Sequence, residues 1–229
     1  MNVSFILRSA SVLVCALAST ASPSQNLPGI PPSIDPTFWG QPNKPYTLKL
    51  TQTSTSVSGS NAPQTHVSEV NVCRDSAGRV RTESFYDSGL PMAVSVRDPD
   101  KNTTTQMMVV GKTASVISIP RPMIPPPGRG WTVERLASRV IDGFPAEGLR
   151  FTRTIPANAN GNDAPDTVID EEWISNNLGV VLEQKTESQR TGTTTKKVSQ
   201  LKQVEPGPTL FTVPSDYSVR QAGPPAQRP

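Results

Sequence analysis

The chain has 229 residues, of which 22 are Lys or Arg and 19 are Asp or Glu, so its formal net charge is only +3. This small excess, with Lys196–Lys197 as the one adjacent basic pair, lacks the basic patch of nucleic-acid-binding proteins and excludes that class of partner. One histidine and two cysteines cannot supply the several nitrogen and sulfur ligands of a zinc site, so we expect neither a metal nor a cofactor.

Residues 1–21 have the pattern of a signal peptide. Arg8 gives a positively charged start, and Ala10–Ala18 forms a short apolar run. The small-x-small pattern that a signal peptidase needs occurs twice, in Ala16–Ala18 and in Ser19–Ala21. The apolar run is shorter than the roughly 20 residues that a membrane-spanning helix needs. The sequence therefore predicts an exported protein, in the periplasm or the medium, with no transmembrane helix in the mature chain.

Cys15 lies inside this predicted signal. A lipoprotein signal has a small residue directly before the acceptor cysteine, whereas Val14 is branched and bulky, so we expect a soluble product without lipid. Cleavage of the signal leaves Cys73 as a single cysteine, which cannot form an internal disulfide. We interpret Cys73 as a buried or half-buried side chain on a strand.

Proline divides the rest of the chain into segments. Residues 22–45 form a proline-rich linker, because proline removes backbone donors and fixes φ. Residues 46–219 form the predicted β domain, which a second proline-rich break interrupts at 120–130. The tail at 220–229 returns to proline, and we expect it to be disordered.

Alternation of apolar and polar residues begins at Tyr46, where Tyr46, Leu48 and Leu50 are separated by Thr and Lys. Such a period of two indicates a strand with one buried face. Short turns, such as Asp75–Gly78 and Asn176–Gly179, connect the repeats of this pattern and favour antiparallel pairing. The predicted strands cover 46–57, 64–73, 79–87, 92–98, 103–110, 113–119, 147–155, 166–175, 178–187 and 194–204.

Residues 132–141 fit two structures equally well. Val133, Leu136, Ala137, Val140 and Ile141 have helical spacing, with Asp142–Gly143 as a helix end. The same Asp-Gly pair is also typical of a hairpin turn that leads into the next strand. The pattern alone also leaves open whether the two halves around 120–130 form one sheet or two.

Candidate catalytic groups are few. His66 alternates with Ser68, Val70 and Val72 and is interpreted as an ordinary strand residue. Asp170 and Glu172 share one predicted strand face, with Glu171 on the other, and two carboxylates at a suitable distance can hydrolyse glycosides. A solvated strand face that pairs with nearby Arg and Lys explains the same residues. We therefore predict no catalytic residue and no enzyme.

Several segments resemble an uncharacterised group of exported bacterial proteins that is common in acidobacteria. The most similar segment is Asp142–Pro156 (DGFPAEGLRFTRTIP), with its Gly-x-x-Ala-Glu-Gly turn and a Thr/Arg-rich strand ending in Ile-Pro. The resemblance covers about residues 46–219 and implies no particular activity. Further matching segments are Asn71–Arg81, Val96–Pro99, Glu172–Ser175 with Leu178–Gly179, and Phe211–Tyr217.

More distantly, the strand and turn pattern and the Phe211–Tyr217 ending are similar to the periplasmic lipoprotein-carrier (LolA-like) superfamily. This resemblance implies a mainly β fold: a single curved antiparallel sheet, or incomplete barrel, of about ten to eleven strands with at most one or two short helices. It also favours a strand at 132–141. Carriers cover the concave face with helices, and this chain offers at most one helix, at 132–141, so a cavity for lipid is less expected than the sheet itself.

The resemblance implies that the concave face takes up acyl chains or a protein partner. The first functional hypothesis is an exported non-catalytic protein that binds an apolar ligand, such as a lipoprotein acyl chain, on this face. An ordinary sealed core explains the candidate residues better than a ligand-binding face does. They are Met92, Val94, Val96, Met107, Met108, Val109, Ile117 and Ile119.

The alternative hypothesis is an envelope sensor or structural protein that binds another protein, for example through a sheet edge. A carboxylate-dependent hydrolase is the least favoured function, because the sequence offers no pair of nucleophile and base.

Overall fold

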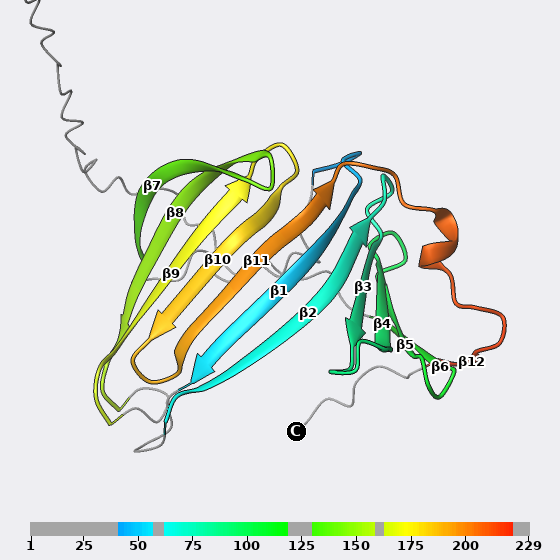
Figure 1. Ribbon diagram of the computed structural model, residues 1–229, viewed down its shortest axis with the longest axis horizontal. Coiled ribbons are helices and arrows are strands. Elements are labelled where there is room, and N and C mark those ends of the chain that lie inside the picture. Colours follow the sequence, from blue (N-terminus) through cyan, green and yellow to red (C-terminus); the bar gives the residue numbers. More distant parts are fainter. Residues whose placement is uncertain (1–40, 57–61, 119–129, 159–162, 222–229) are drawn as a thin grey trace, which may run out of the picture.

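The computed structural model describes residues 41–56, 62–118, 130–158 and 163–221 (Figure 1). The predicted signal peptide at 1–21, the linker up to residue 40, the break at 120–129 and residues 222–229 of the predicted tail lie outside the described residues, as does Ile119. Within the described ranges, no helix is long and apolar enough to cross a membrane.

The described chain is almost entirely β, which confirms the predicted fold class. One short 3-10 helix, η1, covers Pro208–Phe211. The strands of the described ranges are β1 (Tyr46–Ser56), β2 (Gln64–Arg74), β3 (Val80–Phe85), β4 (Pro91–Asp98), β5 (Thr103–Met108), β6 (Thr113–Ser118), β7 (Thr132–Ile141), β8 (Phe144–Ile155), β9 (Asp166–Ser175), β10 (Val180–Ser188), β11 (Gly192–Lys202) and β12 (Ser218–Gln221). The prediction was ten to eleven strands. The additional strand is β12, which extends past residue 219, the predicted end of the β domain.

All these strands belong to one curved, open sheet in the order β12-β6-β5-β4-β3-β2-β1-β11-β10-β9-β8-β7. The neighbours pair antiparallel, apart from the parallel pair of β12 and β6. Because β1 pairs with both β2 and β11, the two halves of the chain join in the middle of the same sheet (Figure 1). This settles the question that the proline-rich break left open.

Residues 132–141 form strand β7, as the resemblance favours. β7 pairs with β8, and the register shifts between Leu136 and Arg139. A bulge adds one residue to a strand and changes the phase of its alternation, which explains why the apolar positions also fitted a helical spacing. Asp142 and Gly143 follow with φ of 50° and 84°, the left-handed conformations of a tight hairpin turn.

The apolar side chains form two clusters. The larger one gathers around Tyr46, Leu178 and Leu182, each 0 % exposed, and draws on strands from β1 to β11. The smaller one consists of Cys73, Val94, Val96, Met107, Ala114 and Phe211. Cys73 is thus a buried strand residue, and burial raises the pKa of its thiol.

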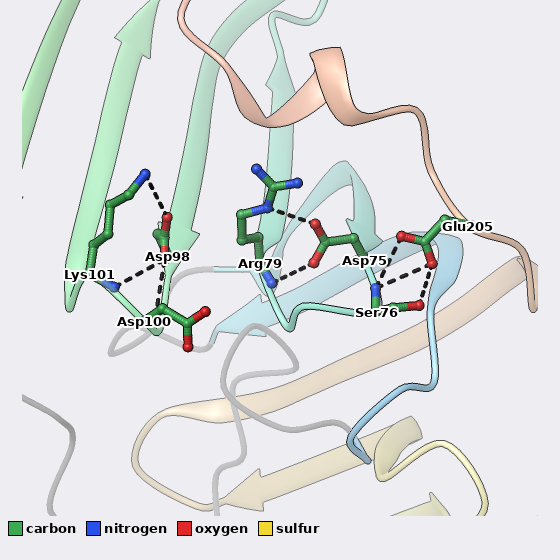
Figure 2. A network of polar contacts seen from close by, with 7 residues as sticks. All are labelled: Asp75, Ser76, Arg79, Asp98, Asp100, Lys101 and Glu205. Atoms are coloured by element: carbon green, nitrogen blue, oxygen red, sulfur yellow. Dashed lines mark hydrogen bonds and ion pairs between the residues drawn. The ribbon is translucent and has the colours of Figure 1, made fainter.

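The segment from 203 to 217, which we call the C-terminal strap, leads from β11 past η1 to β12 at the far edge of the sheet (Figure 1). The turn after β2 holds its beginning, where the Ser76 amide donates to Oε1 of Glu205 at 3.2 Å and the Ser76 hydroxyl donates to Oε2 (Figure 2). Arg79 pairs with Asp75 at 2.7 Å and lies over the Phe211 ring. The strap therefore covers the smaller cluster.

Candidate functional site

Strand β2 is much longer than its neighbour β3. β2 pairs with β1 over its whole length, from Gln64 opposite Ser56 to Arg74 opposite Tyr46. β3 pairs only with Val70–Arg74 of β2. Among the described residues, no strand therefore pairs with Gln64–Glu69 on the side of β3. Figure 1 shows β2 continuing well beyond the end of β3.

The backbone around Phe85 explains why β3 ends early. The register between β3 and β4 shifts between Ser84 and Phe85, and such an irregularity bends a strand. A turn follows directly, in which the Gly89 amide donates to the Tyr86 carbonyl at 2.8 Å and Gly89 has a φ of 80°. The hairpin of β3 and β4 thus turns away from β2 instead of pairing with its first half.

A cleft of about 860 Å³ lies where the two strands part. We call it the β2 cleft. One wall is residues 66–71 of β2, and the other consists of residues 84–87, Gly89 and Met92, with Lys49 and Gln200 also lining the cleft. The cleft is open to solvent: Val67 is 55 % exposed and Tyr86 is 43 % exposed.

The two sides of the sheet differ in polarity within the β2 cleft. Strand alternation from the pairs Val70–Ser84 and Asn71–Glu83 places Val67 and Phe85 on one face, and the pair Glu83–Val94 places Met92 there too. The opposite face carries the polar side chains of His66, Ser68 and Ser84. The ion-paired Lys49 and Glu69 share the face of Val67 and Phe85, and Val70 shares the face of Ser84. The first side therefore combines three apolar side chains with one ion pair, and the second side is mostly polar.

The charges of the β2 cleft do not cancel. Lys49 and Glu69 form an ion pair at 2.6 Å, and the hydrogen bond from Lys49 lowers the pKa of the Glu69 carboxyl. Asp87 also lines the cleft, and it makes no ion pair with any other described residue. One negative charge therefore remains at the turn that forms the second wall.

The residues predicted to line an apolar site do not share one environment. Val94, Val96 and Met107 are buried in the smaller cluster, and Val109 packs against it. Met92 instead lines the β2 cleft.

Met108 and Ile117 lie on the opposite face of the sheet from Met107, since strand neighbours alternate and Ile117 pairs with Thr104. Met108 is 49 % exposed there. Binding of an apolar ligand by this set stays a prediction.

The acidic run on β9 is divided as strand alternation predicts. Glu171 faces the charged side of the sheet and pairs with Arg150 at 2.7 Å, which also binds Glu134 at 3.0 Å. Asp170 and Glu172 are buried on the other face, at 2 % and 0 % exposure, and the amide of Gln184 donates to both. The solvated face that the sequence suggested for them is therefore wrong, because Gln184 and Thr186 provide a buried polar environment instead.

Sequence reasoning placed His66 on a strand, where the structure has it, but missed the open edge beside it. In the register of Val70 and Ser84, the predicted strand at 79–87 would have covered Val67–Glu69, half of that edge, whereas β3 stops at Phe85. The one local signal is Asp87-Ser88-Gly89, which is typical of a turn. In the described part of the chain, no cluster of three or more His, Cys, Asp or Glu residues could hold a metal ion.

No protein-family model matches the chain, and no curated protein matches it. Similar solved structures include a LolA superfamily protein from Nitrosomonas europaea, with a TM-score of 0.37, 9% identity and coverage of 77% of this chain and 94% of that one. The Pseudomonas aeruginosa MucA/MucB complex matches with a TM-score of 0.48, 12% identity and 77% coverage, and the match spans 59% of that chain. A DUF1329 family protein from Desulfovibrio piger has a TM-score of 0.26, 10% identity and coverage of 74% and 90%. The superfamily named from the sequence thus recurs among these structures.

Proposed function

We propose that this chain is an exported, non-catalytic protein that binds another protein in the β2 cleft. The observation that carries the proposal is the exposed edge of Gln64–Glu69, six residues of strand that lie beside an open cleft with apolar side chains. Export is supported by the signal pattern of residues 1–21. Surface sites that combine apolar side chains with unpaired strand backbone are suited to protein partners.

The outer edges of the sheet support this choice by contrast. Soluble proteins commonly protect an exposed edge by making it short or by bending it with a bulge. β12 has only four residues, and β7 has the register shift between Leu136 and Arg139. The inner edge at Gln64–Glu69 has neither device, and it presents the exposed side chain of Val67. We therefore assign the binding role to this edge.

The non-catalytic part of the proposal is supported by the positions of the carboxylates. Asp170 and Glu172 lie on a buried face, where Gln184 and Thr186 hydrogen-bond them. Glu171 is held by Arg150. None of these three carboxylates lines the β2 cleft, where Lys49 instead neutralises Glu69 in an ion pair.

An apolar ligand, such as an acyl chain, is the second candidate. It is favoured by Met92 in the cleft wall and by the exposed side chain of Met108. Mass spectrometry of the protein purified from its native host separates the two candidates, because only this second function predicts lipid that co-purifies.

Site-specific photo-crosslinking in cells of the native host tests the first candidate. A photoreactive phenylalanine derivative replaces Val67 or Tyr86 in the cleft and, as a matched control, Val140 on β7, which is 73 % exposed. We expect a discrete protein adduct at positions 67 and 86 and none at 140. The same adducts at all three positions, or none in the cleft, would contradict the proposed function.

A further inference from the structure

We infer that the partner enters the β2 cleft as an extended segment, which adds to Gln64–Glu69 as a new strand. The segment would have apolar side chains at every second position and a basic residue near Asp87. This inference rests on the proposed function and adds the binding mode and the chemistry of the partner. Three features of the described residues carry it: the backbone of β2, the two faces of the cleft, and its charge.

The backbone of β2 provides the hydrogen-bonding groups. In an antiparallel sheet, alternate residues direct their N–H and C=O groups to opposite neighbours. Along Gln64–Glu69 one set bonds to β1, and the other set points towards the cleft, where no described strand pairs with it. Six residues of strand span about 20 Å, which gives an incoming segment several main-chain hydrogen bonds in sequence.

The two faces of the cleft select the side chains. A strand beside β2 directs its side chains alternately to the two sides of the sheet. On one side they meet Val67, Phe85 and Met92, and on the other side they meet His66, Ser68 and Ser84. The first side also holds Lys49 and Glu69, whose charges neutralise each other, so apolar residues fit it next to Val67, while small polar residues fit the second side. The preferred partner therefore alternates between the two kinds.

The charge of the cleft selects one further residue. Lys49 and Glu69 neutralise each other, whereas Asp87 stands in the second wall without an ion pair among the described residues. A Lys or Arg of the partner near this turn would complete the pairing and would steer the segment into the cleft. Binding should therefore weaken as the salt concentration rises.

The test uses a synthetic peptide of alternating valine and threonine flanked by lysines, and a control peptide of the same composition in shuffled order. Backbone amide exchange of the protein is followed by NMR with and without each peptide. With the alternating peptide, we expect every second amide of Gln64–Glu69 to exchange at least tenfold more slowly, while the amides bonded to β1 stay unchanged. The shuffled peptide should have little effect.

Three variants locate the site. Val67→Asp should weaken peptide binding at least tenfold, whereas Val140→Asp, at an even more exposed strand position on β7, should leave it unchanged. Asp87→Asn should weaken it about threefold at low salt and remove most of its salt dependence.

Two results would overturn the inference. The first is that the alternating peptide does not slow exchange at the edge amides, whether it binds elsewhere or does not bind. The other is slowed exchange at the same amides that depends on protein concentration alone, which would identify a second copy as the occupant. Crosslinking at Val67 to a partner protein would still uphold the proposed function in the first case, so the two failures are distinguishable.

Discussion

Val70 of β2 and Ser84 of β3 form the last in-register pair between these two strands. Beyond this pair β2 continues for six residues, from Glu69 back to Gln64, with β1 as its partner on one side. A strand whose neighbour ends halfway is an uncommon feature inside a sheet, since unpaired backbone groups invite another chain. Beyond the pair of Val70 and Ser84 the two strands separate, and this separation produces both the cleft and its binding chemistry.

The strap residue Phe211 should control access to the smaller cluster. Phe211 is 8 % exposed and packs with Cys73, Val94 and Met107. In protein that carries Cys15→Ser, Phe211→Ala should cost about 3 kcal/mol of the free energy of unfolding and accelerate labelling of Cys73 by a thiol reagent at least tenfold. Leu210→Ala, at a position 42 % exposed, is the matched control and should change neither quantity appreciably. Equal labelling rates in both variants would show that the strap does not seal this cluster.

The end of the strap should respond to acid through one ion pair. Lys112 and Asp216 are 2.7 Å apart, and the hydrogen bond from Lys112 lowers the pKa of Asp216 from its ordinary value of 3.8. A lowered pKa in the folded protein means that the carboxylate stabilises the fold above pH 3.8 and that this contribution is lost as the pH falls through the folded pKa. The stability difference between wild type and Asp216→Asn, from urea unfolding, should therefore be larger at pH 7 than at pH 3. A difference that does not change with pH would refute the role of this pair.

Gly148 should tolerate no side chain. A Cβ atom there would lie 2.7 Å from Nε1 of Trp173 and 2.8 Å from Cβ of Leu136. Gly148→Ala should therefore destabilise the protein by about 1–3 kcal/mol and shift the Trp173 fluorescence, because the indole must move. Gly111→Ala is the control, since its Cβ would meet only Oγ1 of Thr113 at 3.8 Å. Comparable unfolding curves for the two variants would contradict the close packing of Leu136 and Trp173 around Gly148.

The sequence patterns predicted most of the strands well because those strands keep an unbroken period of two. Prediction was weakest where the backbone departs from that period. The bulge between Leu136 and Arg139 gave β7 an apparent helical spacing. The consecutive residues Met107 and Met108 were assigned to one face, although strand neighbours must point to opposite faces.

The candidate site depends on strand lengths and on long-range contacts, which local patterns do not encode. β3 ends at Phe85 because of a register shift against β4, a property of the pair and not of either segment. Burial of Asp170 and Glu172 likewise depends on Gln184 from the neighbouring strand. These features could not be found from alternation and turn residues alone.

The open edge of β2 is the feature on which the proposed function depends, and amide hydrogen exchange of the free protein tests it most directly. NMR follows the exchange of each backbone amide of β2 separately. We predict alternating fast and slow exchange along Gln64–Glu69 and slow exchange throughout Val70–Arg74, where β1 and β3 both pair with β2. Uniformly slow exchange from Gln64 to Arg74 would contradict the open edge.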